Sequence, residues 1–208
     1  RKDAEKLGYP DSFTIYDTSD SLEVVKRIIK EMNLDEKAFP NRAVLTEISR
    51  AKDAGITPEQ YLARAQATHN PRNIRIGEIY QAYWQRLFSA GAMDFDDLIY
   101  NTVRLLDEHA DVRKSWSSKF KYVLIDEYQD TNALQDALYT CLATPSGDDL
   151  FLVGDLKQSI YRFRQAEPGI FRQKLDSWPL LPGAKARPRP PEGTPGTDAL
   201  LALSLIHI

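Results

Sequence analysis

The feature that most constrains this 208-residue chain is the stretch FKYVLIDEYQDTN at residues 120–132, where an apolar run ends in two adjacent carboxylates. The run at residues 122–125 is short, β-branched and aromatic, which is typical of a strand buried on both faces of a parallel sheet. Asp126 and Glu127 then stand at the carboxyl end of that strand, where open α/β sheets bind ligands. The stretch therefore predicts an α/β fold with a ligand site at this strand end.

The two carboxylates suit phosphate chemistry. Mg²⁺ is commonly held by one or two protein carboxylates together with substrate phosphates and water, and Asp126 fits that role. Glu127 points the other way from a strand end and is a candidate to accept a proton from an attacking water. The alternative is a strand that simply ends with two acidic residues in solvent. The apolar run before them and the polar residues after them favour the ligand site.

A second apolar run, at residues 150–153, leads to Asp155. The segment between the two runs carries Leu at helical spacing and is predicted to form a crossover helix. A strand, a helix and a strand of these lengths make one right-handed βαβ unit. We therefore expect parallel strands at about residues 120–126 and 149–154, with Asp126 and Asp155 at the same edge of the sheet.

The part of the chain before this unit is predicted to be mainly helical, from residue 20 to residue 118. One predicted helix has an apolar stripe formed by Ile76, Ile79, Tyr80, Tyr83 and Leu87. A later helix is predicted to begin at the acids of MDFDDL, because the helix macrodipole favours negative charge at that end. Its apolar stripe is predicted to include Phe95. The run at residues 13–16 is strand-like.

The segment LKQSIYRFR, at residues 156–164, alternates two aromatic residues with two arginines. Bases stack on aromatic faces and guanidinium groups pair with phosphates, so this composition suits single-stranded nucleic acid. Taken alone, the segment is read more readily as an amphipathic stretch with core aromatics and solvated arginines. Gln158 is a candidate phosphate sensor because it lies near the first strand end, although a lone Gln there is usually a turn residue.

Composition limits the class of protein. The formal net charge of −3 does not favour nucleic acid as a partner, but binding needs only a local basic patch. The single cysteine, Cys141, excludes an internal disulfide framework and fits a reducing compartment, so we expect a cytoplasmic protein. No apolar run reaches the roughly 18 residues of a membrane span, and no membrane partner is expected.

The composition changes after Trp178. Residues 179–196 are rich in Pro and Gly without an apolar period, which is typical of disorder. The ending LSLIHI resembles translated sequencing-adapter sequence. Residues 179–208 are therefore predicted to be a disordered or non-native tail, and the alternative is a genuine linker to another domain.

The strings VLIDEYQDTN and LVGDLKQSIYRFRQAEP resemble motifs II and III of the UvrD/Rep-like superfamily 1 DNA helicases, in order and at the expected separation. FTIYDTSDSLEVVKRIIKEMNLD, ITPEQY and AMDFDDLIYNTVRLL are similar to the helical insertion of this family and its return to the first motor domain. The resemblance covers about residues 1–175. It implies an incomplete parallel sheet of the P-loop NTPase (RecA-like) kind. Residues 1–92 would be a mainly helical inserted subdomain, and residues 93–178 part of the ATP-binding motor domain.

The resemblance also implies roles in ATP hydrolysis. Asp126 would bind Mg²⁺, and Glu127 would activate the hydrolytic water. Gln158 would contact the γ-phosphate of ATP and couple it to DNA. The remaining residues expected to couple ATP hydrolysis to movement are Gln129, Asp130 and Asp155. The cofactors implied are ATP and Mg²⁺.

On the DNA side, Tyr161 and Phe163 would stack on bases of single-stranded DNA, and Arg164 would assist at the junction between DNA and nucleotide. The family often has Trp where this chain has Phe163, which keeps a smaller stacking face. The implied function is an ATP-dependent DNA helicase that moves 3′ to 5′ in DNA repair or replication. Its partners would be single-stranded DNA and junctions between single and double strands.

One element of an ATP site is missing from the sequence. A phosphate-binding loop has the pattern G-x-x-x-x-G-K-[ST], and no Gly of this chain is followed by Lys. The resemblance places that loop before Arg1 and a second motor domain after the chain. We therefore expect the 208 residues alone to be inactive and the parent protein to hydrolyse ATP.

Two other functions remain open. One is the helicase subunit of a helicase–nuclease of the AddA/RecB kind, which the string KQSIYRFRQAEP favours. The other is a nucleic-acid-binding module without catalysis. The pair Asp126 and Glu127 argues against that module, because binding alone requires neither carboxylate.

Overall fold

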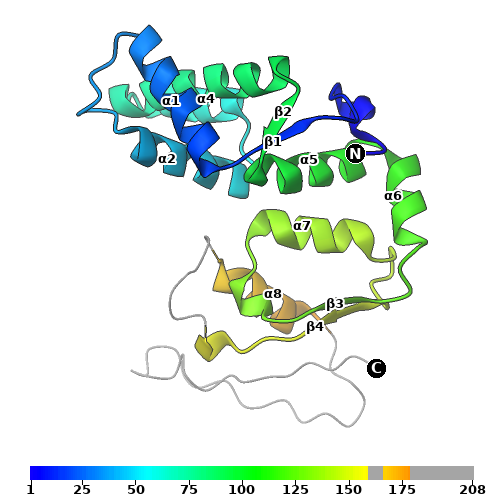
Figure 1. Cartoon of the computed structure of the whole chain (residues 1–208). Coiled ribbons are helices and arrows are strands. Elements are labelled where there is room, and N and C mark those ends of the chain that lie inside the picture. Colours follow the sequence, from blue (N-terminus) through cyan, green and yellow to red (C-terminus); the bar gives the residue numbers. More distant parts are fainter. Residues whose placement is uncertain (159–165, 179–208) are drawn as a thin grey trace, which may run out of the picture. The chain divides into compact units, whose positions relative to one another are not determined.

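A computed structural model describes residues 1–158 and 166–178 of the chain, shown in Figure 1. These residues form two compact units that divide between Val112 and Arg113. Each unit contains helices and one pair of parallel strands, so the predicted α/β class is confirmed. The predicted tail after residue 178 lies outside the described residues. The predicted domain boundary at residue 92 does not coincide with the division at residue 112, and the assignment of an inserted subdomain stays a prediction.

The first unit is mainly helical. Its elements are η1 (Ala4–Leu7), β1 (Thr14–Tyr16), α1 (Thr18–Glu31), α2 (Asn41–Asp53), α3 (Pro58–Ala67), α4 (Pro71–Ser89), β2 (Ala92–Asp94) and α5 (Phe95–Glu108), and α6 (Ala110–Ser117) crosses the division. This confirms the predicted helical block. The strand β2 was not predicted, because its three residues stand directly before a helix start.

Capping and an apolar core explain these helices. Asp17, Thr57 and Asp94 each form a reciprocal capping box at the start of α1, α3 and α5, which satisfies backbone N–H groups that the helix leaves unpaired. The predicted stripe of α4 is buried and packs with residues of α1 and α2, including Val25, Ile28, Val44 and Ile48. In Figure 1, α1, α2 and α4 lie together in the first unit.

The strands β1 and β2 pair in parallel, with Thr14 opposite Ala92 and Tyr16 opposite Asp94. Their carboxyl ends therefore lie at the same edge. Each strand is followed almost at once by a helix, α1 after β1 and α5 after β2. This edge brings together two helix N-termini and the side chains that cap them.

The second unit contains β3 (Val123–Ile125), η2 (Tyr128–Asp130), α7 (Ala133–Leu142), β4 (Leu150–Leu152), η3 (Leu156–Gln158) and α8 (Pro168–Ser177). β3 and β4 are parallel, with Val123 opposite Leu150 and Ile125 opposite Leu152, and α7 lies between them in the chain. The predicted strand–helix–strand order and parallel pairing are therefore confirmed. Its core includes Val123, Tyr128, Leu150, Leu152 and Phe171.

The prediction that β3 is buried on both faces is wrong for the described residues. Val123 is buried, but the Leu124 side chain is 73% exposed and the neighbouring Tyr122 is 53% exposed. The described core residues cover the face of the strand pair that carries Val123, Leu150 and Leu152. Leu124 and Tyr122 lie on the other face, which those residues leave open.

Within the described residues, no helix combines the length and the apolar character needed to cross a lipid bilayer.

Candidate functional site

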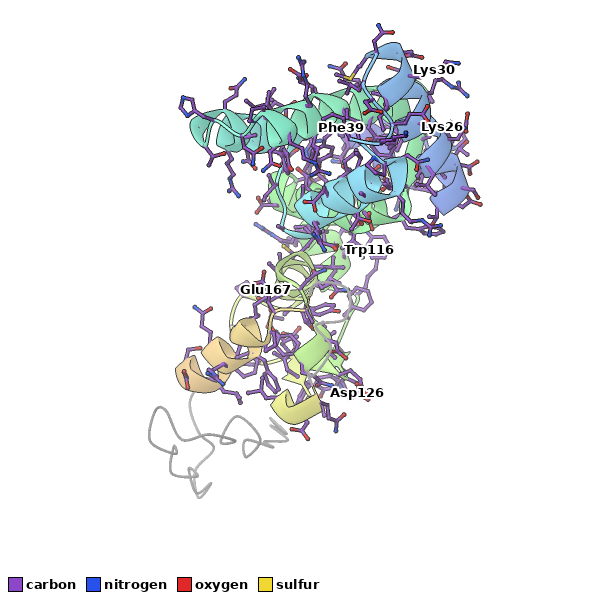
Figure 2. The ribbon with its side chains drawn as sticks, turned by 90° about the vertical axis from the view of Figure 1, so that its left-hand side faces the viewer. Lys26, Lys30, Phe39, Trp116, Asp126 and Glu167 are labelled. Atoms are coloured by element: carbon purple, nitrogen blue, oxygen red, sulfur yellow. The ribbon has the colours of Figure 1, made fainter. Side chains whose placement is uncertain are left out.

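The predicted site residues of the second unit meet at the carboxyl edge of β3 and β4. The N–H of Val153 donates to the carbonyl of Ile125 at 2.8 Å, and the N–H of Tyr128 donates to the carbonyl of Val153 at 2.8 Å. These bonds extend the pairing past the ends of both strands. Asp126, labelled in Figure 2, therefore stands on the same edge as Asp155, as predicted.

Asp126 and Glu127 are both exposed, so solvent and ligands can reach their carboxylates. Asp126 Oδ1 accepts a hydrogen bond from the backbone N–H of Glu127 at 2.9 Å, which orients the carboxylate. Glu127 has a φ of 57° and a ψ of 36°, in the left-handed region that residues with a Cβ rarely adopt. This backbone conformation turns the chain sharply from β3 into η2.

Gln129 links the two strand ends. Its side chain is 2% exposed, its Nε2 donates to Glu127 Oε2 at 3.0 Å, and its Oε1 accepts from the N–H of Asp155 at 2.9 Å. Asp130, the next residue, is half-buried and donates its backbone N–H to the carbonyl of Glu127 at 2.9 Å. Gln129 and Asp130 therefore contact Glu127 directly, whereas sequence reasoning assigned them only by resemblance.

Gln158 lies three residues beyond Asp155. Its backbone N–H donates to the carbonyl of Asp155 at 2.9 Å, and its exposed side chain approaches Asp155 Oδ2 at 3.5 Å. The structure thus brings Asp126, Glu127, Gln129, Asp155 and Gln158 to one edge. The remaining predicted contacts, at Tyr161, Phe163 and Arg164, lie outside the described residues.

A buried tyrosine connects this edge to the helices of the second unit. Tyr128 is 1% exposed, and its hydroxyl donates to Asp136 Oδ1 on α7 at 2.6 Å. Lys174 on α8 pairs with the same carboxylate oxygen at 2.9 Å. Burial, and then the hydrogen bond to Asp136, raise the pKa of Tyr128 above its ordinary value, so the hydroxyl remains a donor. These contacts hold η2, and with it the edge, against α7 and α8.

The donor set at this edge fits Mg²⁺ bound together with phosphates. No group of three or more His, Cys, Asp or Glu side chains that could hold a metal by themselves occurs among residues 1–158 and 166–178. Mg²⁺ sites that handle nucleotides typically use one or two carboxylates and take their other ligands from phosphates and water. An exposed, oriented Asp126 carboxylate meets that requirement.

A cavity of about 250 Å³ lies in the first unit, at the carboxyl ends of β1 and β2. Residues of α1, α2 and the start of α5 line it, among them Thr18, Arg42, Ser49 and Phe95. Phe95, which the sequence placed among the apolar residues of α5, is 60% exposed. An exposed aromatic ring and an arginine that line one cavity are a combination that suits a nucleic-acid base and its phosphate.

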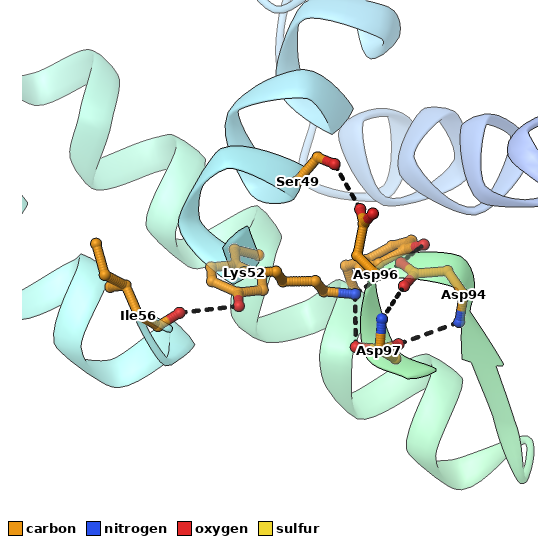
Figure 3. A network of polar contacts seen from close by, with 8 residues as sticks. Ser49, Lys52, Ile56, Asp94, Asp96 and Asp97 are labelled. Atoms are coloured by element: carbon orange, nitrogen blue, oxygen red, sulfur yellow. Dashed lines mark hydrogen bonds and ion pairs between the residues drawn. The ribbon is translucent and has the colours of Figure 1, made fainter. Parts of the chain in front are cut away.

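A buried ion cluster explains why Phe95 is exposed (Figure 3). Lys52 on α2 is 1% exposed and pairs with Asp94 Oδ2 at 2.6 Å and with Asp97 Oδ1 at 2.7 Å. Tyr83 also donates its hydroxyl to Asp94 Oδ2, at 2.8 Å. Asp97 therefore occupies the inward face of the first turn of α5, and Phe95, two residues earlier, is directed elsewhere.

The charges of Lys52, Asp94 and Asp97 shift one another's pKa. Burial alone would lower the pKa of Lys52, but the carboxylates of Asp97 and Asp94 outweigh it and raise that pKa. Burial raises the pKa of Asp97 to about 6, although the Lys52 ammonium opposes the shift. The sequence contained a signal for the acids, at a helix start, but none for Lys52, which is 42 residues from Asp94 in the chain.

Comparison with known proteins identifies what the chain resembles. Residues 1–179 match the family described as UvrD/REP helicase N-terminal domain. An "ATP-dependent DNA helicase PcrA" from Bacillus subtilis is 40% identical over 167 residues, which is 80% of this chain. A protein of the same name from Leuconostoc citreum is 39% identical over 166 residues, again 80% of this chain. The chain spans 22% of the length of each of these curated relatives.

Proposed function

Because the chain belongs to the UvrD/REP helicase family, we propose that its full-length gene product couples ATP hydrolysis to movement along single-stranded DNA and to unwinding of duplex DNA. The observation that carries the proposal is the edge after β3 and β4, where two exposed carboxylates stand beside Gln129, Asp155 and Gln158. The mixed α/β architecture with short parallel sheets agrees with part of a RecA-like motor domain.

In this proposal the two carboxylates have different tasks. Glu127 is the general base that accepts a proton from the attacking water. Asp126 holds Mg²⁺, which, when bound with ATP, offsets the negative charge of the phosphates. The different side-chain environments support this division, because Asp126 is fixed by a backbone N–H and Glu127 by the Gln129 amide.

Gln158 and the residues after it connect ATP to DNA in the proposal. Gln158 contacts the γ-phosphate. Asp130 holds the turn after Glu127 through its backbone N–H, and Asp155 holds the turn that leads to Gln158. Tyr161 and Phe163 stack on bases, and Arg164 lies at the junction of DNA and nucleotide. The exposed Phe95, which lines the same cavity as Arg42, is a further candidate for contact with a single strand.

The finer features of the function are also proposals. We infer 3′-to-5′ polarity, action at junctions of single and double strands, and a role in DNA repair or replication. The names of the curated relatives support an ATP-dependent DNA helicase in place of a binding module without catalysis. A cytoplasmic location stays a prediction.

The proposal is tested by Glu127→Gln in the full-length gene product. Loss of the general base should lower the turnover number for ATP by about 10²–10⁴-fold, because base catalysis contributes that much. ATP affinity should stay nearly unchanged, since the substituted amide keeps the size of the side chain. The measurements are steady-state ATP hydrolysis and equilibrium binding of a fluorescent ATP analogue.

Glu108→Gln is the matched control, because Glu108 is an exposed glutamate of α5 that pairs with Arg104 one turn earlier in the same helix. It should hydrolyse ATP like the wild type. Single-stranded DNA should raise the wild-type rate, and duplexes with a 3′ tail should be unwound in preference to those with a 5′ tail. A wild-type protein without ATPase activity, or a fully active Glu127→Gln variant, would contradict the proposal.

A further inference from the structure

The Gln129 amide at the candidate site is buried, although the Glu127 carboxylate that it contacts is exposed. Gln129 is 2% exposed, and a buried amide is stable only when its donor and acceptor are both satisfied. Oε1 accepts from the N–H of Asp155, and Nε2 donates to Glu127 Oε2. Both halves of the amide therefore have defined partners on two different segments.

The orientation of this amide is determined by its neighbours. The backbone N–H of Asp155 can only donate, so it requires the amide oxygen. The amide nitrogen must then face Glu127, whose carboxylate can only accept when ionised. Each contact thus enforces the other, and the side chain cannot turn over without losing both.

Gly154 leaves the space that this arrangement needs. A Cβ at residue 154 would lie 2.6 Å from Gln129 Oε1 and 3.1 Å from its backbone nitrogen. The same Cβ would lie 3.0 Å from the ring of Phe171. The turn after β4 can therefore approach Gln129 this closely only because residue 154 has no side chain.

An exposed glutamate usually samples many side-chain rotamers, and a general base must instead be held near the atom whose proton it takes. Glu127 starts from an unfavourable backbone, with a φ of 57°. Its backbone is fixed by bonds from Tyr128 to Val153 and from Asp130 to Glu127. The bond from Gln129 fixes its carboxylate.

We propose that Gln129 is a positioning residue, which sets the direction of the Glu127 carboxylate and ties it to the Gly154–Asp155 turn. It does not itself contact the reacting atoms. The turn leads within three residues to Gln158, so any shift of that turn changes the position of the base through one side chain. This inference rests on the proposed role of Glu127 as general base.

The test is Gln129→Met in the full-length gene product, because Met has similar length and volume but neither donates nor accepts at these positions. The turnover number should fall about tenfold to a hundredfold, which is less than removal of the base itself. The KM for ATP should change by no more than about twofold, because the amide does not bind the substrate.

A double mutant separates positioning from a general loss of structure. If Gln129 acts through Glu127, adding Gln129→Met to Glu127→Gln should cost no further activity, because the interaction is already lost. A purely structural role would lower the activity of the double mutant by the product of both effects. The inference would be overturned if Gln129→Met and Glu127→Gln lowered the turnover number independently of each other.

Gln135→Met is the matched control. Gln135 lies in α7, shortly after η2. Its Oε1 accepts a hydrogen bond from the backbone N–H of Asn132 at 3.1 Å, and it has no role at Glu127 in this proposal. This variant should lose some thermal stability and keep the wild-type turnover number. Gln129→Met with a wild-type turnover number would also overturn the inference.

A second variant covers the case in which Gln129→Met does not fold. Gln129→Glu keeps an acceptor for the N–H of Asp155 and removes the donor to Glu127. Its turnover number should fall while the KM for ATP stays within about twofold of the wild type, because only the positioning contact is lost. A wild-type turnover number in Gln129→Glu contradicts positioning by Gln129, whereas an inactive wild type, or an active Glu127→Gln variant, contradicts the proposed function instead.

Discussion

At the scale of single residues, the site depends on the missing side chain of Gly154 as much as on the side chains of its neighbours. The atoms that a Cβ would meet belong to Gln129 and Phe171, and both residues are 2% exposed. Neither can move into solvent without leaving the core. The close approach of the β4 turn to η2 is therefore a fixed requirement of the site.

We predict that Gly154→Ala destabilises the second unit by about 1–3 kcal/mol, because an added methyl group overpacks a filled region. It should also lower ATP turnover in the full-length gene product, since the Gln129 amide must shift. Urea unfolding of the 208-residue chain and steady-state hydrolysis check the two effects.

Gly169→Ala is the control for this prediction. A Cβ at residue 169 meets nothing within 4 Å, and the residue lies in α8, so alanine should be neutral or stabilise the helix by up to about 1 kcal/mol. If Gly154→Ala and Gly169→Ala behaved alike in both assays, the close-packed turn would not matter to the site.

The sequence predicted which residues carry the chemistry and left out how they are held. Asp126 and Glu127 could be placed at a strand end because the apolar run before them is local. The bond that the N–H of Asp155 donates to Gln129 Oε1, and the bond from the N–H of Tyr128 to the carbonyl of Val153 beside the left-handed Glu127, both involve the turn after β4, more than 20 residues further along the chain. A pattern within one strand contains no information about such a partner.

At the scale of elements, one buried lysine holds α2 to the start of α5. Lys52 is surrounded by Asp94, Asp97 and Tyr83, and its nitrogen lies 5.1 Å from the centre of the Tyr83 ring. Buried ions are stable only when paired. The contact therefore fixes the β2–α5 turn relative to α2, and with it the wall of the cavity that Phe95 borders.

We predict that Lys52→Met destabilises the first unit by about 3–5 kcal/mol, because it leaves the carboxylates of Asp94 and Asp97 buried without a counter-charge. Urea unfolding followed by the fluorescence of Trp84, in a chain with Trp116 and Trp178 replaced by Phe, measures the loss. Trp84 lies in α4 and reports on this unit alone.

Lys26→Met provides the comparison, since Lys26 is exposed on α1, where Figure 2 labels it. An exposed substitution of this kind should stay within about 0.5 kcal/mol of the wild type. Adding Asp94→Asn and Asp97→Asn to Lys52→Met should restore part of the lost stability. An equal, small effect of both lysine substitutions would show that the ion cluster does not hold the elements together.

Helices were easier to predict than strands. The stripe of α4 was predicted correctly because its spacing is sufficient to define a buried helical face. The burial of Leu124 was predicted wrongly. A strand sequence shows that one face is apolar, but it does not show which segment of the chain covers that face. The strand β2 was not predicted, because its residues stand directly before the acids that mark the start of α5.

At the scale of the whole molecule, the chain divides into two compact units, and the first has cores of its own. One core joins α1, α2 and α4, and another includes Leu7, Tyr9, Phe13 and Met93. The resemblance predicted a boundary after residue 92 on grounds of ancestry, whereas β2 and α5 pack within the first unit. A boundary defined by compact packing need not coincide with one inferred from similarity to a protein family.

We predict that residues 1–118 fold without the rest of the chain, since they contain the first unit and the whole of α6. Circular dichroism should show a mainly helical spectrum and a single cooperative urea transition. Its midpoint should match that of the Trp84 signal in the 208-residue chain. Ile79→Ala, which empties a site that is 0% exposed, should lower the stability of the fragment by about 2–5 kcal/mol. A gradual transition, insensitive to Ile79→Ala, would contradict an independent fold.

The left-handed backbone of Glu127 has a consequence for how this position evolves. A residue with a Cβ costs roughly 1–2 kcal/mol in this conformation, and glycine or asparagine would adopt it more readily. Drift under selection for stability alone should therefore replace this glutamate, and only selection for turnover retains it. In a library selected first for solubility and then for growth, residue 127 should be among the positions where the two selections choose different amino acids.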